Sequence, residues 1–562
     1  MIQLGISAFY HDAAACLVKD GKVLLAVEEE RFTEVKHDAS FPVNAIQWLL
    51  EESRIKITDI DEVCWYENPD IKKDRVLKTF NKRPFRTYFQ RRKFLKEQKE
   101  HSPESLLQAI GFTGPILYTD HHLSHSAFSF YTSNYSTAAI LTVDGVGEWE
   151  TVTISAGIGT KIHKHISIDF PNSLGMLYST ITAYLGFKPN EGEYKVMGLA
   201  PYGLANKYKE KLDKVFEKQT HNKFWINQKY FTWEYSDKIM FTSKLGRLLG
   251  FPPRLPEDPV EQHHKDLAAA LQAVYEEQFS KLLTTAKNIT KLDNICLGGG
   301  CAYNGVANVK AFEKFSSVHI PFAPSDAGSA IGACLYHYYL KDKTNKRISN
   351  SDPYLGPSYS NTEIKKALKK YDNIFAYKLS EEKLIDKTAD LLKNQNIVAW
   401  FQGRMEFGAR ALGNRSILAS PSEANMRERL NYVIKKREGF RPFAPSVLEN
   451  EASTWFDIKD AVPYMNVVCD AKVINNIYPF KAATHINGSC RVQTVNSNQN
   501  DRYFKLLQAT KYKTGAGVLL NTSFNLKDQT ITMTPDQAIK RFINSKINFL
   551  VIGNYLLTKD IK

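Results

Sequence analysis

Apolar, strand-like runs followed by Gly or Asp turns recur through the first 335 residues and predict β-strands. These runs cover residues 4–9, 22–30, 138–145, 151–157 and 294–300. Helical patterns alternate with them. In residues 264–286, for example, Leu267, Leu271 and Val274 recur at a spacing of three or four. Alternating strands and helices predict an α/β fold.

The pattern also predicts how the chain is divided. Turns near Asp12 and Asp144 follow separate strands and indicate two related halves around a cleft. A polar segment at 339–357 is the best candidate for a linker, with the division near residue 350. New strands are expected at 396–403, 517–524 and 548–557, with helices between them, so the second domain is also expected to be α/β. The predicted domains are 1–345 and 355–562.

Composition narrows the class of protein. The 562 residues are 43% hydrophobic, as expected for a globular protein, and no apolar stretch reaches about eighteen residues, so no membrane insertion is expected. The start "MIQLGISAFYHD" does not resemble a signal peptide. The seven cysteines are scattered without a CxxC pair, which argues against disulfides and structural zinc and favours a cytoplasmic location.

Positive charge is concentrated in one stretch. The chain has a net charge of +14, and residues 72–99 hold twelve Lys or Arg and two acidic residues. Phe80, Phe85, Tyr88, Phe89 and Phe94 are interleaved with them. The stretch is either a patch for phosphates, nucleic acid or an acidic surface, or an amphipathic insertion whose aromatic residues pack on their own domain. The insertion is favoured, and nucleic acid disfavoured, because no nucleic-acid motif accompanies the charge.

The stretch "TDHHLSHSAFSF" contains the first candidate for chemistry. His121 and His125 are four residues apart and share one face of a helix, whereas His122 points about 100° away. Spacing alone favours surface or capping histidines over a metal site. Asp144 at a strand end and Asp326 in a small-residue loop that opens a helix would complete a shell for Fe(II), Mn(II) or Zn(II), provided that the four residues converge.

Two glycine-rich turns follow apolar strands, "VDGVGE" (143–148) and "LGGGCAYNG" (297–305). Such turns either point backbone N–H groups at phosphate oxygens or are tight turns without a ligand. The sequence has no Walker A loop and no strand-linked GxGxxG fingerprint.

The second domain contains the densest group of basic residues. They lie among Gly, Ala and Pro rather than among acids, and comprise Arg404, Arg410, Arg415, Lys435, Arg437 and Arg441. Asn521 and Ser523 in "LLNTSFN" add neutral hydrogen-bonding groups. Arg near apolar segments is costly unless an anion pairs with it, so a phosphate site is favoured over a solvated basic face.

Taken together, these motifs resemble the O-carbamoyltransferases of the NodU/CmcH family. The matching stretches include "DHHLSHSAFSF", "NEGEYKVMGLAPYG", "PSDAGSAIGA", "FQGRMEFGARALGNRSILASP" and "KKREGFRPFAPS", in the family's order over nearly the whole chain. The resemblance implies an N-terminal, TsaD-like duplicated α/β domain of the actin/hexokinase (ASKHA) type and a C-terminal YrdC-like α/β domain. No family motif matches residues 72–99.

The resemblance also implies a reaction. The C-terminal domain would make carbamoyl-adenylate from carbamoyl phosphate and ATP, with Mg²⁺, releasing pyrophosphate and phosphate. A hydroxyl of an acceptor (a sugar, an antibiotic or another natural product) would then take the carbamoyl group in the N-terminal domain. A homodimer is compatible with the resemblance.

The resemblance assigns site residues by position. The metal ligands, with Fe(II) as the expected ion, would be His121, His125, Asp144 and Asp326. The N-terminal nucleotide would lie near Gly145, Gly299, Gly300 and Asn304. His11 and Asp12 would lie where the acceptor hydroxyl enters, and His11 as the general base is a hypothesis. Ligands of ATP and carbamoyl phosphate would be Arg410, Lys435, Arg441, Arg491 and Ser523, and chemistry alone adds Arg415 and Asn521.

Other functions compete with this interpretation. A tRNA threonylcarbamoyl-transfer enzyme uses both domain types, but the motif set follows the O-carbamoyltransferases. A sugar-kinase-like or Hsp70-like ATPase would leave the C-terminal Arg cluster unexplained. A binding protein without catalysis predicts no ATP turnover and no metal.

Overall fold

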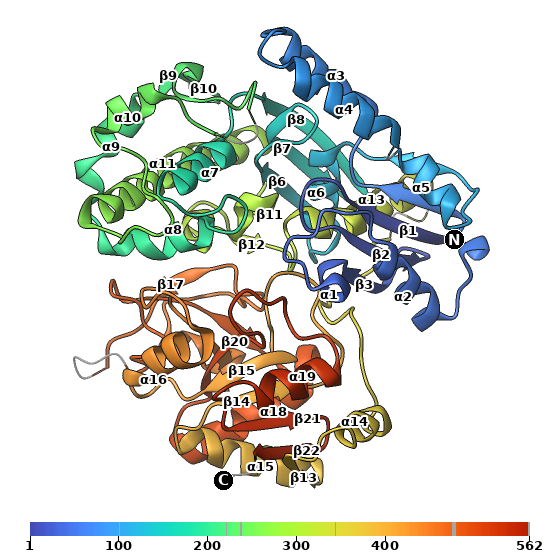
Figure 1. The fold of residues 1–562 in the computed structure, drawn as a ribbon, viewed down its shortest axis with the longest axis vertical. Coiled ribbons are helices and arrows are strands. Elements are labelled where there is room, and N and C mark those ends of the chain that lie inside the picture. Colours follow the sequence, from blue (N-terminus) through green and yellow to red (C-terminus); the bar gives the residue numbers. More distant parts are fainter. Residues whose placement is uncertain are drawn as a thin grey trace. The chain divides into compact units, whose positions relative to one another are not determined.

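The computed structural model describes residues 1–562 except 101, 221, 237–238, 343, 345, 475–478 and 560–562, and except the side chains of residues 97–100. The chain divides into two compact units (Figure 1). The first comprises residues 1–29 and 39–351, and the second comprises residues 30–38 and 352–562. No helix in the described part of the chain combines the length and apolar character needed to cross a membrane.

The first sheet of the first unit has the order β3-β2-β1-β4-β5. Its strands are β1 (Ile2–Ser7), β2 (Ala14–Lys19), β3 (Lys22–Glu28), β4 (Glu62–Trp65) and β5 (Ile116–Tyr118). The pairs β1–β2 and β2–β3 are antiparallel, whereas β1–β4 and β4–β5 are parallel.

The second sheet repeats this plan, with the order β8-β7-β6-β11-β12. Its strands are β6 (Thr137–Val143), β7 (Glu150–Ile158), β8 (Lys161–Asp169), β11 (Asn294–Gly298) and β12 (Ser317–His319). Again the first two pairs are antiparallel and the last two parallel. This repeat confirms the predicted duplicated α/β fold of the actin/hexokinase type.

Two helices pack closely in the first unit, α6 (His121–Tyr131) and α13 (Asp326–Lys341). Close approach requires Gly332, because a Cβ atom there would lie 2.0 Å from the Ser124 carbonyl oxygen. The small residues of "DAGSAIGA" therefore bring the start of α13 near the histidines of α6. The "SAFSF" segment of α6 is buried, as expected.

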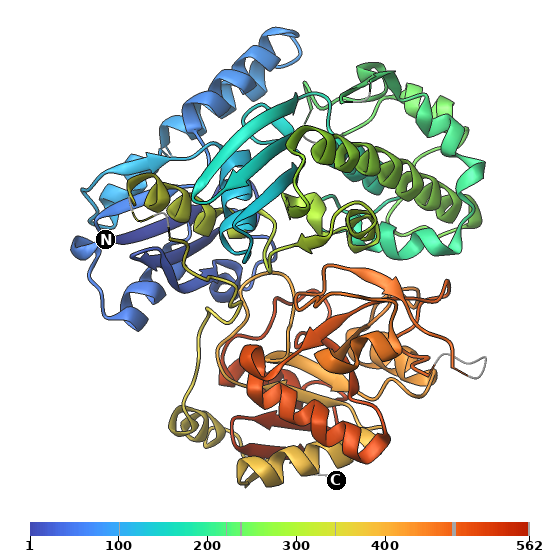
Figure 2. The same cartoon turned by 180° about the vertical axis from the view of Figure 1, so that it is seen from behind.

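The predicted helix 264–286 is confirmed as the longer α11 (Gln262–Thr290), the long green helix of Figure 2. A hairpin of α3 (Pro69–Asn81) and α4 (Tyr88–Glu100) stands out from the edge of the first unit in both views (Figures 1 and 2). The other elements of this unit are α2 (Val43–Ser53), α5 (Pro103–Ala109), α7 (Leu174–Tyr184), α8 (Glu193–Leu199), α9 (Lys209–Asp213), β9 (Phe216–Gln219), β10 (Phe224–Ile226), α10 (Ser243–Leu249) and α12 (Gly305–Phe312).

The second unit contains a mixed sheet of order β13-β22-β21-β14-β15-β20-β16-β19. These strands are β13 (Ile374–Lys378), β14 (Val398–Phe401), β15 (Arg415–Ala419), β16 (Ala444–Leu448), β19 (Gln493–Val495), β20 (Val518–Ser523), β21 (Phe549–Ile552) and β22 (Tyr555–Lys559). Buried Trp400, Leu392 and Tyr503 join the sheet to α15 (Glu381–Lys393) and α18 (Ser497–Thr514) in one core. The expected second α/β domain is thus confirmed.

Smaller elements complete the second unit. They are α1 (Glu30–Thr33), α14 (Asn361–Leu368), α16 (Asn425–Glu428), α17 (Ala452–Trp455), β17 (Val468–Asp470), β18 (Ser489–Arg491) and α19 (Pro535–Ile543).

Two features of the second unit were not predicted. The single strand expected at 548–557 is wrong: a turn at Gly553, with φ of +53°, folds it into the antiparallel pair β21–β22. Residues 30–38, early in the sequence, belong to this unit. Phe32 packs on Met405, and Arg541 donates to Glu34 at 2.7 Å. The strand expected at 22–30 gave no sign of this change, whereas the observed strand β3 ends at Glu28.

Candidate functional site

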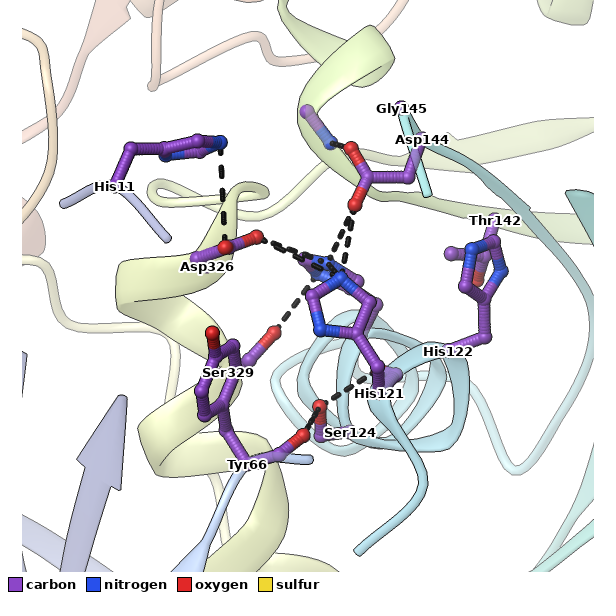
Figure 3. A network of polar contacts seen from close by, with 12 residues as sticks. His11, Tyr66, His121, His122, Ser124, Thr142, Asp144, Gly145, Asp326 and Ser329 are labelled. Atoms are coloured by element: carbon purple, nitrogen blue, oxygen red, sulfur yellow. Dashed lines mark hydrogen bonds and ion pairs between the residues drawn. The ribbon is translucent and has the colours of Figure 1, made fainter. Parts of the chain in front are cut away.

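Four side chains that are far apart in the sequence meet in the first unit (Figure 3). His121 begins α6 and His125 lies one turn later, Asp144 follows β6 directly, and Asp326 is the first residue of α13. All four are buried, and one potential ligand atom from each lies within 4.8 Å of the others. The convergence on which the metal hypothesis depended is therefore present.

The nitrogen and oxygen atoms of this His/Asp cluster face one another. Asp144 Oδ2 lies 2.9 Å from His121 Nε2 and 3.3 Å from His125 Nε2. Asp326 Oδ1 lies 3.7 Å and 3.5 Å from the same two nitrogens, which are 3.1 Å apart. Two imidazoles and two carboxylates surround one small volume, and together they form a mixed N/O donor set of the kind that divalent transition metals prefer.

The surroundings of the Asp326 carboxylate indicate whether a cation fits the cluster. Neither of its oxygens has a hydrogen-bond partner, although the side chain is fully buried. An unpaired buried carboxylate is costly, and a bound cation would remove that cost. The second ring nitrogen of His125, Nδ1, lies 2.9 Å from Ser329 Oγ, a contact that orients the imidazole. The residues therefore suit a metal ion, and the cluster can bind one.

The pKa shifts of the cluster residues reflect the same excess of negative charge. Burial alone would lower the pKa of His121, but Asp326 and Asp144 outweigh it and raise that pKa to about 9. Burial alone would raise the pKa of Asp144, yet the two histidines hold it well below its ordinary value. Protons on the imidazoles thus balance the carboxylates in the absence of a cation.

His122 turns away from the cluster, as its position on the helix predicts (Figure 3). Its Nδ1 lies 3.4 Å from Thr153 Oγ1. Burial, with the neighbouring charge of His121, lowers the pKa of His122 well below its ordinary value. The ring is a neutral part of the interior.

His11 lies beside the cluster. Its Nε2 is 4.0 Å from Asp326 Oδ2, and its Nδ1 is 2.9 Å from Asp12 Oδ2. Asp12 has φ of +52° and Phe9 has φ of +72°, values that non-glycine residues rarely adopt, so this turn is strained on both sides of His11. Burial lowers the pKa of His11, but Asp326 and Asp12 outweigh it and raise that pKa to about 10.

The predicted nucleotide residues have local roles. The backbone N–H of Gly300 donates to Asp144 Oδ1 at 3.1 Å and so holds a carboxylate of the cluster. Gly299 has φ of +84°, and a Cβ atom there would lie 2.3 Å from the Val143 carbonyl oxygen. Gly145 is less crowded, since its added Cβ would lie 3.6 Å from Tyr10 Oη.

Asn304 caps α12 through a bond from Ala307 N to its Oδ1 at 3.1 Å. Its amide also exchanges hydrogen bonds with Gln272, at 3.1 Å each. Its relation to a nucleotide stays a prediction.

Two further residues near the His/Asp cluster, Glu148 and Arg75, were not predicted from the sequence. Glu148 accepts hydrogen bonds from the backbone N–H of His121 at 3.0 Å and of Asn68 at 2.6 Å, joining the start of α6 to the start of α3. Arg75 of α3 lies over the Phe170 ring at 5.3 Å, near Tyr10. Glu148 ends the "VDGVGE" motif and was within reach of prediction, whereas Arg75 was one of many basic residues in the stretch 72–99.

A cluster of cations occupies the second unit. Burial and the neighbouring charges of Arg410, Arg437 and Arg441 hold the pKa of Arg491 well below its ordinary value. The carboxylate of Glu438 lies 3.6 Å from Arg441. So many like charges gathered around one half-buried guanidinium favour an anionic ligand. The predicted Arg410, Arg441 and Arg491 are thus brought together, and Arg437 joins them.

Lys435 extends this cation cluster. It ends a π-helix at Arg429–Lys435, a form often found at functional sites. Its Nζ donates to Ser523 O at 2.5 Å and to Asn525 O at 2.9 Å. Burial, together with Arg437, Arg441 and further cations, holds the pKa of Lys435 well below its ordinary value. Ser523, also predicted, donates its Oγ to Asn525 Oδ1 at 2.7 Å.

The two residues that chemistry alone added lie inside the protein. The Arg415 guanidinium is fully buried and donates to carbonyl oxygens, including those of Gln402 at 2.5 Å and Pro357 at 2.9 Å. Asn521 is buried, and its amide donates to Gln493 at 2.9 Å. These bonds give both side chains a part in holding the sheet and its loops together.

Comparison with known proteins decides the family. The profile described as "Carbamoyltransferase N-terminus" matches residues 2–335, and the profile "Carbamoyltransferase C-terminus" matches residues 389–559. The chain belongs to the carbamoyltransferase family. The predicted NodU/CmcH-type membership is confirmed, and the protein is an enzyme that transfers a carbamoyl group from a donor to an acceptor.

Two relatives match nearly the whole length of this carbamoyltransferase, and a third matches about half of it. "Uncharacterized protein sll1178" of Synechocystis sp. is 39% identical in sequence to this chain, and the alignment covers 99% of this chain and 96% of the relative. "Nodulation protein NolNO" of Sinorhizobium fredii is 33% identical, covering 98% of this chain and 80% of its own. "3'-hydroxymethylcephem-O-carbamoyltransferase" of Amycolatopsis lactamdurans is 30% identical, covering 52% of this chain and 54% of its own.

Proposed function

We propose that this carbamoyltransferase is an ATP-dependent O-carbamoyltransferase whose two units carry out successive steps. The second unit makes carbamoyl-adenylate from carbamoyl phosphate and ATP, and the first unit transfers the carbamoyl group to a hydroxyl. One observation carries the proposal: the first unit gathers buried carboxylates and imidazoles, whereas the second gathers cations around the half-buried Arg491. We assign the steps to domains at about residues 1–345 and 355–562, the boundaries predicted from the sequence.

The first step needs positive charge. Water cleaves carbamoyl phosphate to phosphate and carbamate, and a carbamate oxygen then attacks the α-phosphorus of ATP and expels pyrophosphate. Two polyanions must approach each other, and Arg410, Arg441 and Arg491 supply fixed charge that screens their repulsion. Lys435 is held in place by Ser523 O and Asn525 O, and a bound anion would favour its charged form. Mg²⁺ accompanies the ATP as co-substrate.

The second step needs an acceptor hydroxyl beside an activated carbonyl. A divalent metal bound by His121, His125, Asp144 and Asp326, with Fe(II) as the expected ion, would act as a Lewis acid towards the adenylate phosphate. His11 lies on the edge of this cluster and is held by Asp12 at 2.9 Å. A cation on Asp326 would offset the charge that raises the pKa of His11 and favour the neutral imidazole. We assign this neutral His11 to take the proton from the attacking hydroxyl oxygen as the carbamoyl C–O bond to the phosphate breaks and AMP leaves.

The acceptor is proposed as a class. The relative from Amycolatopsis lactamdurans is named as an O-carbamoyltransferase of a hydroxymethyl group. By analogy, the acceptor here is a hydroxyl of a sugar, an antibiotic or another natural product. The carbamoyl group of a mixed anhydride is already activated, so a strong base is not required.

Mass spectrometry tests the proposal. The full-length enzyme, loaded with Fe(II) and given ATP, Mg²⁺ and carbamoyl phosphate, should release pyrophosphate without threonine or bicarbonate. Candidate hydroxyl acceptors should then gain the mass of one carbamoyl group. Pyrophosphate release that requires threonine and bicarbonate would instead support a threonylcarbamoyl-transfer enzyme and would overturn the proposal.

A further inference from the structure

The α3–α4 hairpin presents aromatic side chains that the first unit does not cover. Phe85 is 99% exposed, Phe89 80% and Tyr88 57%. These residues lie in the hairpin tip, which we define as residues 84–93. Phenylalanine side chains exposed to this extent lose the free energy of burial, and clusters of them mark surfaces that bind a partner.

The hairpin is held by contacts between its two helices and by contacts of its base with the rest of the first unit. The rings of Phe80 and Phe94 meet edge to face at 6.4 Å, and the buried Thr87 donates to the Phe80 carbonyl oxygen at 2.9 Å. At the base, Lys82 pairs with Glu234 at 2.6 Å and Arg83 lies over the Tyr235 ring at 4.3 Å. The expectation that the aromatic residues pack on their own domain is therefore right for Phe80 and Phe94 and wrong for those at the tip.

The tip is also strongly basic. Residues 75–96 contain no acidic residue, and the tip itself contains four Lys or Arg. Arg86, Arg92 and Lys93 are exposed near the aromatic residues. This charge is complementary to an anionic surface and falls off within about one Debye length, so a partner must come close to the tip.

We propose that the hairpin tip docks this carbamoyltransferase on an anionic lipid surface. Aromatic rings that sit at the level of the lipid headgroups, flanked by Lys and Arg that attract acidic headgroups, describe peripheral membrane binding. Binding is shallow and reversible, and no helix in the described residues crosses the bilayer. The inference does not depend on the proposed reaction, because it concerns a surface and not turnover.

A lipid surface accounts for the shape of the tip better than a nucleic acid does. Proteins that bind single strands stack bases on aromatic residues along a groove that follows the backbone. Here Phe85 and Phe89 are exposed, and they belong to a hairpin that stands out from its unit (Figures 1 and 2). A fluid bilayer can take up protruding rings without such a groove.

Vesicle sedimentation of the full-length protein tests this proposal. Phosphatidylcholine vesicles should leave the protein in solution, and vesicles that also contain phosphatidylglycerol should pellet it. Binding to the latter should weaken as salt rises from about 0.1 M to about 0.5 M. The F85S/F89S variant should bind about tenfold more weakly or worse, and so should R92E/K93E.

Matched controls come from the second unit. Y512S removes a side chain that is 92% exposed, and K365E/K366E reverses two exposed lysines of α14, so neither should change vesicle binding. Unchanged thermal melting of F85S/F89S shows that this variant is folded. Equal binding to both kinds of vesicle, wild-type binding by both tip variants, binding of an oligonucleotide instead of vesicles, or self-association through the tip without vesicle binding would each overturn the proposal.

Discussion

The His/Asp cluster of the first unit and the cation cluster of the second are opposite in charge and alike in construction. In the first, Asp326 is buried and neither of its carboxylate oxygens has a hydrogen-bond partner. In the second, Arg491 is half-buried among other guanidinium groups. Each arrangement is costly in isolation and becomes favourable with a ligand of the other sign. The contrast teaches that the sign of the unbalanced charge indicates the ligand: a metal cation for one unit and phosphate anions for the other.

Removal of a metal ligand should reduce the rate of carbamoyl transfer more than any other change considered below. We expect D326N to lose the bound metal and to transfer carbamoyl about 100- to 1000-fold more slowly, because one anionic ligand and the Lewis acid are lost together. Metal analysis and acceptor mass spectrometry measure the two effects. H122A is the matched control on α6, since that ring lies outside the cluster. Wild-type metal content in D326N would show that the four residues are not the ligands.

Loss of one cation should have the next largest effect. R491M should slow pyrophosphate release about 100-fold, because a guanidinium that faces the phosphates is removed. Metal content should not change. R429M is a control on the π-helix, where Arg429 donates to the Gln395 carbonyl oxygen. If R491M and R429M released pyrophosphate equally fast, the cation cluster would not be the site of the first step.

Metal affinity should depend on pH in the direction that the His121 pKa sets. A pKa raised to about 9 means that the metal-free cluster holds a proton at neutral pH, and metal binding must displace it. Apparent affinity should therefore fall about tenfold per pH unit below pH 9 for each proton displaced. Calorimetry in buffers of different ionisation enthalpy counts these protons. Affinity that is constant between about pH 6 and 8 would contradict this result.

The smallest of these effects is expected for His11, which borders the cluster without belonging to it. H11A should slow carbamoyl transfer by about tenfold and leave pyrophosphate release and metal content unchanged, because the activated carbonyl needs only a weak base. The pH profile of transfer should lose its dependence on one group in the same variant. Transfer at the wild-type rate would remove His11 from the mechanism.

Local signals predicted where parts of the His/Asp cluster lie, but they favoured surface or capping histidines, and only the family resemblance assigned the residues as metal ligands. The spacing of His121 and His125 fixes a shared helix face, and the position of Asp144 after a strand fixes where its carboxylate lies. Convergence with Asp326 could not be predicted from spacing, because it depends on the contact of α6 and α13 at Gly332. The duplicated sheets followed from strand patterns, whereas the transfer of residues 30–38 to the second unit depends on tertiary contacts such as that of Glu34 with Arg541.

The cation cluster was predicted less completely. Composition identified Arg410, Lys435 and Arg441, but residue type alone could not separate a guanidinium that faces an anion from one that donates to carbonyl oxygens. Arg415 is of the second kind. Only the fold distinguishes the two.

One measurement tests the central claim most directly: pyrophosphate release and carbamoyl transfer measured together in D326N and in R491M. If the two clusters serve successive steps, D326N should still give a burst of pyrophosphate from ATP and carbamoyl phosphate while transfer is lost, and R491M should lose both. A parallel loss of pyrophosphate release and transfer in D326N, with metal-free but folded protein, would contradict the division of the reaction between the two units.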